Sequence, residues 1–82
     1  MSNGKQIKGW FVRHLETGGV MHESGLLETP VSPGKVRLYP TLIQVNAAIG
    51  RFENWYGAVV LYEGETIDEN GYVRNSEGEV VR

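Results

Sequence analysis

The sequence predicts one α+β domain, built from a four- or five-stranded mixed sheet with a single amphipathic helix packed on one face. Three observations predict this class. Residues 41–52 show a helical repeat behind a capping residue, residues 58–62 are all apolar, and Asn70-Gly71 is a hairpin turn signal. With 82 residues the chain has room for one hydrophobic core, so we expect 1–82 to be a single domain.

The N-terminal part of the chain predicts a β-hairpin. Residues 6–14 are rich in β-branched and aromatic side chains, and residues 20–22 can return as a short second strand. Glu16-Thr17-Gly18-Gly19 supplies the turn, because glycine reaches positive φ at little cost. Residues 23–34 contain two prolines and two glycines, and we expect a loop there.

The middle of the chain predicts a strand, a helix and a second strand. In residues 35–39, Val36 and Leu38 fall on one face and Arg37 and Tyr39 on the other, as in a strand. A helix then links this strand to residues 58–62, whose unbroken apolar run indicates a strand covered on both faces. Such a unit forms a right-handed crossover, so we expect the two strands to run parallel, adjacent or one strand apart.

The helix itself is predicted from Leu42 to about Phe52. Thr41 is a good N-cap, and Gln44 three residues later completes a capping box. Apolar residues recur at spacings of three and four along one face, at Leu42, Val45, Ala48, Ile49 and Phe52.

The C-terminal part predicts a second hairpin. Asn70-Gly71 is flanked by Thr66-Ile67 and by Tyr72-Val73, and a further turn at residues 76–78 leads to Val80-Val81. These segments are short and charged, which is typical of edge strands.

Composition narrows the classes of function. The chain has no cysteine, which excludes disulfides and thiolate metal sites. Its polar first residues show no signal peptide, and no apolar run is long enough to span a membrane, so we expect a cytoplasmic protein. The net charge is −2, and six of the ten acidic residues follow Tyr62. Without a basic stripe, a nucleic-acid partner is not expected.

The sequence shows no centre for catalysis or for a metal. It has no nucleophile elbow, no dinucleotide fingerprint and no P-loop. His14 and His22 lie on the predicted hairpin at a spacing that matches no metal-ligand motif, so we expect them to be exposed hairpin residues. Asp68 and Glu69 adjoin a turn, where acidic residues are common. We therefore expect no enzyme activity, no metal and no cofactor.

Arginine and aromatic side chains are the best candidates for a binding site. Arg37 and Tyr39 share a strand face, and Arg51, Trp55 and Tyr56 follow the helix. Arginine beside an aromatic ring offers cation–π contact and bidentate hydrogen bonds to an anion, and both residue types are common in protein interfaces. The alternative is that Trp55 and Tyr56 close the core while both arginines are merely solvated.

The arrangement of one helix on a sheet also bears on assembly. A single helix covers one face of such a sheet, and the aromatic residues are numerous for so small a core. We therefore expect the chain to form a homo-oligomer through the uncovered face.

Residues 37–51, RLYPTLIQVNAAIGR, resemble a pattern in small uncharacterised bacteriophage proteins. In that pattern a strand ending in Leu-Tyr runs into a capped helix with small residues and a basic residue near its end, followed by a valine-rich strand. The resemblance extends to Tyr62 and implies an accessory phage or prophage product. Such proteins often inhibit host enzymes, block host defence or sequester defence signals. No catalytic motif accompanies the resemblance, so no functional residue carries over.

The leading hypothesis is a non-enzymatic, phage-type accessory protein that neutralises a host factor as an anti-defence protein. Its partner would be a host protein whose surface it blocks, or a small anionic ligand such as a nucleotide signal that it sequesters. One alternative is a structural or assembly subunit of a phage particle or larger complex. Another is a small enzyme acting on a nucleotide or peptide.

Overall fold

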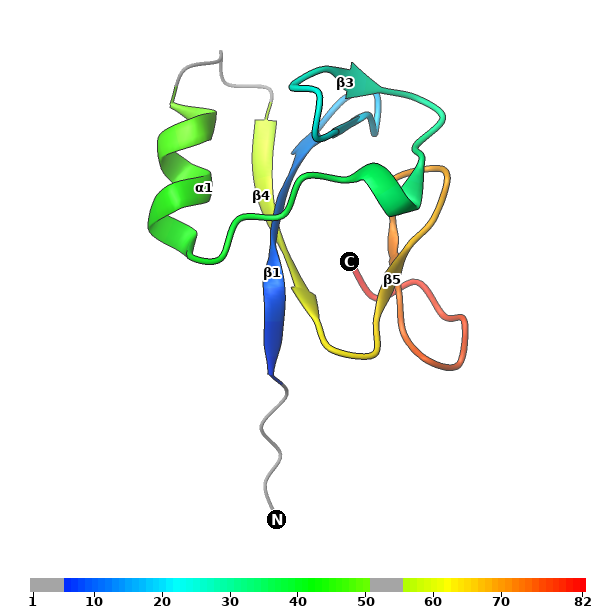
Figure 1. Ribbon diagram of the computed structural model, residues 1–82. Coiled ribbons are helices and arrows are strands. Elements are labelled where there is room, and N and C mark those ends of the chain that lie inside the picture. Colours follow the sequence, from blue (N-terminus) through cyan, green and yellow to red (C-terminus); the bar gives the residue numbers. More distant parts are fainter. Residues whose placement is uncertain (1–5, 51–55) are drawn as a thin grey trace.

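The computed structural model describes residues 6–50 and 56–82, and these form an α+β fold, as predicted (Figure 1). A four-stranded sheet has the order β3-β2-β1-β4, and a separate two-stranded sheet pairs β5 with β6. The elements in chain order are β1 (Ile7–His14), β2 (Val20–Met21), β3 (Leu27–Glu28), the 3₁₀ helix η1 (Pro33–Lys35), α1 (Leu42–Ile49), β4 (Tyr56–Tyr62), β5 (Thr66–Ile67) and β6 (Val73–Arg74).

The long antiparallel pair of β1 and β4 is the centre of the four-stranded sheet. The register places Trp10 opposite Val60 and His14 opposite Tyr56. On the other edge of β1, Arg13 pairs with Val20 of β2, which confirms the predicted N-terminal hairpin. The turn between these strands uses Gly18 at a φ of 77°.

The predicted loop of residues 23–34 contains more structure than expected. β3 lies within it and pairs with β2, with Met21 opposite Leu27. Gly25 closes the connection at a φ of 88°, a value that favours glycine. Sequence reasoning missed this strand because two residues carry no alternation from which a strand can be predicted.

In segment 35–39, Lys35 ends η1 and the chain is extended from Val36 on, but it forms isolated bridges instead of a regular strand. Val36 bridges to His22 and Tyr39 bridges to Trp10, both antiparallel. Trp10 also pairs with Val60, so segment 35–39 and β4 lie on opposite edges of β1. Since both run antiparallel to β1, they run parallel to each other, one strand apart, as predicted.

The expected mixed sheet is nevertheless wrong. Every ladder in the described part of the chain is antiparallel. The reason is that β1 inserts between the two strands of the predicted crossover unit and pairs with both. The crossover prediction allowed one strand between these two, but the sequence did not show that this strand would be β1, antiparallel to both.

The helix begins as the capping box predicts. Thr41 Oγ1 accepts a hydrogen bond from the Gln44 backbone N–H at 3.2 Å, which satisfies one of the free donors of the first turn. Val45 is fully buried, whereas Ile43 on the opposite side is 81% exposed. The helix ends at Ile49; the predicted extension to Phe52 lies outside the described residues.

The hydrophobic core forms two clusters on opposite faces of β1, because neighbouring strand residues point to opposite sides. Phe11 belongs to the cluster that faces β5 and β6, together with Leu61, Ile67 and Val73. Val12 belongs to the cluster under α1, together with Met21 and Val45. The sheet therefore lies between α1 and the β5–β6 sheet (Figure 1). The face that we expected to be free for self-association is covered by β5 and β6, so homo-oligomer formation stays a prediction without that support.

The β5–β6 hairpin turns at Asn70-Gly71, as predicted. Gly71 has a φ of 86°, and a Cβ atom built there would lie 2.3 Å from the Gly18 carbonyl oxygen. Backbone oxygen cannot move away as a flexible side chain can. Only glycine therefore allows the second hairpin to pack this closely against the turn after β1.

Replacing Gly71 with alanine should therefore destabilise the fold strongly. Gly78 is the matched control, because its φ is 83° but nothing lies within 4 Å of an added Cβ. We expect Gly78→Ala to cost about 1–2 kcal/mol for the left-handed backbone alone, and Gly71→Ala to cost roughly 4 kcal/mol or more through the added overlap. Urea denaturation measures both free energies of unfolding, and equal losses would contradict the packing argument.

Asp68 organises the same turn. Its Oδ1 accepts hydrogen bonds from the backbone N–H groups of Asn70 and Tyr72, each at 2.9 Å, and its Oδ2 accepts one from Arg74 Nε at 2.9 Å. Burial acts to raise the pKa of Asp68, but the hydrogen bonds from Tyr72, Arg74 and Asn70 outweigh it and hold the pKa below its ordinary value.

The lowered pKa predicts how stability depends on pH. The carboxylate contributes stability that is present above the unfolded-state pKa of about 3.9 and is lost as the pH falls through the lower folded-state pKa. Asp68→Asn should lower the free energy of unfolding at pH 7, and its deficit should shrink in strong acid, where the native carboxyl is protonated too. Denaturation curves at pH 7 and near pH 2 test this; a deficit independent of pH would contradict it.

Candidate functional site

The structure places two of the five predicted binding residues together. Arg37 and Tyr39 are next to each other on one face of segment 35–39, and Tyr56 lies at the start of β4, opposite His14. Arg51 and Trp55 are outside the described residues. The structure therefore describes three of the five residues, and of these Arg37 and Tyr39 lie together.

Arg37 and Tyr39 form a stacked pair. The guanidinium carbon of Arg37 lies 5.3 Å from the centroid of the Tyr39 ring, within cation–π range. Tyr39 is half-buried and packs against the cluster under α1, and its hydroxyl donates to Met21 Sδ at 3.6 Å. The ring is thus fixed from below, while the exposed Arg37 lies over it. No ion pair joins Arg37 to a carboxylate in residues 6–50 and 56–82.

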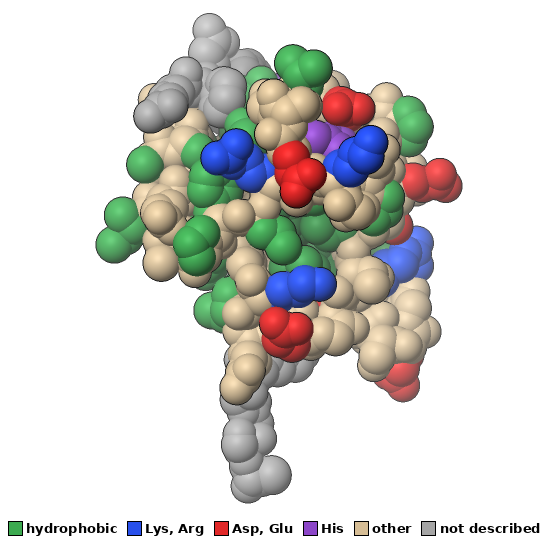
Figure 2. Space-filling view, in the orientation of Figure 1, with side chains coloured by type: hydrophobic (Ala, Val, Ile, Leu, Met, Phe, Trp, Pro, Cys, Tyr) green, Lys and Arg blue, Asp and Glu red, His purple; other side chains and the backbone are tan. Residues whose placement is uncertain are grey.

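This pair borders a hollow beside the helix, here called the α1 groove. The groove has a volume of about 420 Å³, and Pro40, Ala47 and Ala48 give it an apolar, sterically small surface. Arg37 supplies its one formal charge, and Gln44 supplies an amide. Figure 2 shows several hydrophobic side chains on the side of α1 and toward the middle of this face, where Lys and Arg side chains lie with Asp and Glu side chains beside them.

Tyr56 has a different role from the one predicted for it. Its ring meets His14 edge to face, with centroids 4.9 Å apart and planes at 87°. It packs against the cluster under α1 and does not line the α1 groove. Tyr56 thus fits the alternative that an aromatic residue after the helix closes the core.

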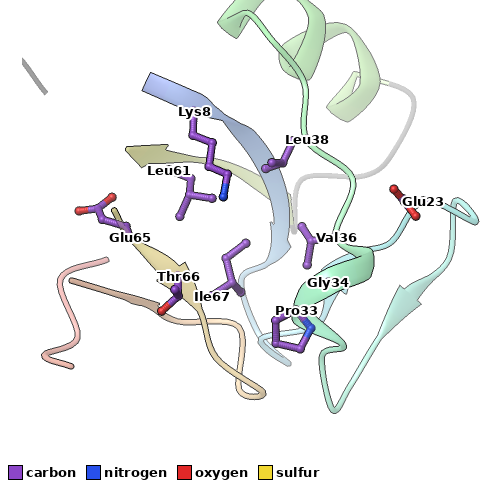
Figure 3. Close-up of a pocket in the computed structure, with 10 residues that line it drawn as sticks. All are labelled: Lys8, Glu23, Pro33, Gly34, Val36, Leu38, Leu61, Glu65, Thr66 and Ile67. Atoms are coloured by element: carbon purple, nitrogen blue, oxygen red, sulfur yellow. The ribbon is translucent and has the colours of Figure 1, made fainter. Parts of the chain in front are cut away.

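A second and larger hollow, here called the Lys8 groove, opens between segment 33–38 and β5 (Figure 3). Its volume is about 570 Å³, and the side chains of Val36, Leu61 and Ile67 form its floor. Lys8 reaches over it from β1. Sequence reasoning missed this groove because its walls come from four separate segments of the chain. The direction of Lys8 is also explained only by the strand register, which the sequence does not show.

The Lys8 side chain is aimed by a β-bulge. Ile7 pairs with Tyr62 and Gly9 pairs with Leu61, so two steps along β1 match one step along β4. Lys8 is the extra residue, and bulges of this kind redirect a side chain relative to the regular alternation. The result is a cation at the mouth of an apolar groove.

His22 differs from its prediction as an exposed hairpin residue. Its side chain is 2% exposed, and Nε2 accepts a hydrogen bond from the Ser32 N–H at 3.0 Å. Nδ1 must then carry the ring hydrogen, which it donates to the Val20 carbonyl at 2.9 Å. Both ring nitrogens are thus occupied: Nδ1 bonds to β2 and Nε2 to the chain after β3, so the imidazole joins these two segments.

His14 and the acidic side chains are the remaining candidates for a metal site. Within residues 6–50 and 56–82, no three His, Asp or Glu side chains are grouped so that they could hold a metal ion. His14 Nδ1 accepts the backbone N–H groups of Glu16 and Thr17, which makes it part of the hairpin turn.

Comparisons with family models, with curated proteins and with solved structures find no match to this chain. None of the helices in the described residues is long and apolar enough to cross a membrane.

Proposed function

We propose that this chain is a non-catalytic binding protein that holds a small anionic ligand in the α1 groove and so removes it from a host. The observation that carries the proposal is the Arg37 guanidinium, stacked on Tyr39 and without a carboxylate partner among the described residues. A fixed, uncompensated guanidinium at the edge of an apolar hollow suits a ligand that combines an anionic group with an apolar or planar part.

The chemistry of the groove favours a phosphate or carboxylate over a neutral ligand. Arginine presents its N–H donors in a planar fork that bonds both oxygens of such a group at once. Tyr39 limits the motion of that fork, so less conformational entropy is lost when the ligand binds. The small side chains of Pro40, Ala47 and Ala48 leave room for a flat group such as a nucleotide base.

The host-directed part of the proposal comes from the sequence. The resemblance of residues 37–51 to small bacteriophage proteins covers the same strand and helix that border the α1 groove. Sequestering an anionic or nucleotide signal is one role that this resemblance implies, and it is compatible with a groove of this chemistry.

A second candidate function is the blocking of a host protein surface. Its support is the apolar surface beside the α1 groove, where Ile43 is 81% exposed, Leu42 is 44% exposed and Leu38 is 37% exposed. Apolar residues grouped in this way are typical of protein contact sites. Such a contact would depend on Ile43 more than on Arg37.

The test of ligand binding begins with native mass spectrometry of gently purified protein, followed by NMR titration with nucleoside monophosphates, nucleoside triphosphates and cyclic dinucleotides. We expect saturable shifts at Arg37, Gln44 and Ala47 for at least one phosphate ligand. Arg37→Gln should weaken its affinity by roughly tenfold or more, since hydrogen bonds to charged groups contribute about 1.5–3 kcal/mol.

Lys35→Gln is the matched control, because it removes an exposed positive charge two residues away that does not line the groove. It should leave the affinity nearly unchanged. Equal losses in the two variants would show a diffuse charge effect and contradict a site at Arg37. A host protein captured by the wild type and lost in Ile43→Ser, with Arg37→Gln unaffected, would favour surface blocking.

A further inference from the structure

The Lys8 groove is a second candidate site, separate from the α1 groove and without a role in the proposed function. Its floor is strongly apolar: Leu61 is 3% exposed, Ile67 is 7% exposed and Val36 is 8% exposed. A volume of about 570 Å³ falls within the range of roughly 300–1,000 Å³ typical of ligand sites. At this groove the hydrophobic cluster that faces β5 and β6 is therefore open to solvent.

Lys8 is the one cation among the residues that line this groove. Glu23 and Glu65 line it too, and Glu23 lies at the end away from Lys8, beyond Val36 (Figure 3). In Figure 3 its side chain extends between Leu38 and Leu61, with the nitrogen over the groove. No ion pair joins Lys8 to a carboxylate within the described ranges. Glu65 also lines the groove, but it is paired with Arg82 and accepts the Tyr62 N–H at 2.8 Å. An incoming anion would therefore meet a lysine ammonium beside an apolar floor.

The edge of β5 adds a backbone feature to the site. Val73 N–H donates to the Arg82 oxygen and Val73 oxygen accepts from Val81 N–H, so both main-chain groups of Val73 point away from β5. Ile67 lies opposite Val73 and is the non-hydrogen-bonded partner in this ladder, so its N–H and C=O point away from β6. Residues of β5 line the groove and those of β6 do not. Two residues after Ile67 the Glu69 carbonyl already accepts the Val31 N–H at 2.8 Å, so the open main-chain groups on this side are those of Ile67.

We infer that the Lys8 groove binds the C-terminal end of a peptide whose last residue is aliphatic. The free carboxylate lies against the Lys8 ammonium, the aliphatic side chain enters the floor between Leu61 and Ile67, and the peptide backbone pairs with the Ile67 edge. These three features together match the recognition of a chain end by strand addition, in which main-chain bonds give affinity and a side-chain pocket gives specificity. A small apolar acid would use the first two features and leave the edge unpaired.

The test uses acetylated pentapeptides of glycine and serine that end in valine, leucine or isoleucine, titrated into the full chain by NMR. We expect saturable shifts at Lys8, Thr66 and Ile67. The same peptides with a C-terminal amide should bind at least about tenfold more weakly, because the charge-assisted bond to Lys8 is lost. Isovalerate, which has the carboxylate and the branched chain but no peptide backbone, should also bind more weakly.

Variants of Lys8 separate the ionic contact from the fold. Lys8→Gln should reduce affinity for the free-acid peptides to that of the amides, and Lys8→Arg should restore most of it, with both spectra otherwise matching the wild type. Arg37→Gln, in the other groove, should bind the peptides as the wild type does. The inference is overturned if none of the free-acid peptides binds, if amides bind equally well, or if isovalerate binds as tightly as the peptides.

Discussion

The guanidinium of Arg13 reaches from β1 across to the second hairpin. It donates from Nε and Nη2 to the Gly71 carbonyl at 2.9 and 2.6 Å, and from Nη2 to the Arg82 main-chain oxygen at 3.1 Å. Its carbon also lies 5.6 Å from the ring centroids of both Phe11 and Tyr72. Burial lowers the pKa of Arg13, while Tyr72 and Asp68 act to raise it. Most of its donors therefore meet protein acceptors in a site partly removed from water.

Much of the molecule depends on this contact, because the two sheets share no strand ladder in the described residues. Arg82 makes a second connection of the same kind, since its Nε donates to the Val60 carbonyl at 3.1 Å and its Nη2 to Glu65. Between the two arginines, β5 and β6 are held over Phe11 and Leu61, which closes the first cluster. The Lys8 groove lies where the contact between the two sheets is left open to solvent.

Local patterns allowed much of the fold to be predicted. Thr41 and Gln44 are neighbours in sequence, so the helix start followed from the residues themselves, and Asn70-Gly71 specifies its turn in the same way. Residues 36–39 alternate as expected, so the prediction that Arg37 and Tyr39 share one face agrees with their stacked arrangement.

Contacts between distant segments explain what sequence reasoning missed. Arg13 and its acceptor Gly71 are 58 residues apart, and that acceptor is a backbone oxygen, which any residue type provides. His22 is buried because Ser32 and Val20 satisfy its ring nitrogens, and neither partner forms a motif with it. The direction of the Lys8 side chain follows from a register shift between β1 and β4. The sequence of β1 alone gives no sign of that shift.

Two grooves of different chemistry therefore lie on either side of segment 35–39. Its outward residues Arg37 and Tyr39 border the α1 groove, and Val36 and Leu38 point toward the Lys8 groove (Figure 3). Leu38 lines both. A segment held by two isolated bridges rather than a full ladder thus provides one wall for each site. Each groove has one cation beside apolar residues, but the Lys8 groove is also lined by Glu23 and Glu65 whereas the α1 groove has no carboxylate. The cation beside apolar surface is the main reason for proposing a binding role.

Arg13 holds the second sheet against the first and so shapes the Lys8 groove. Hydrogen exchange followed by NMR in Arg13→Met tests it most directly, because methionine keeps the aliphatic stem and removes the donors. We expect faster exchange at Asp68, Val73 and Val81, whose N–H groups are hydrogen-bonded within the second hairpin and the chain after it, with protection retained in the β1–β4 ladder at Phe11 and Val59. Unchanged protection of β5 and β6, or an equal loss of protection throughout both sheets, would contradict it.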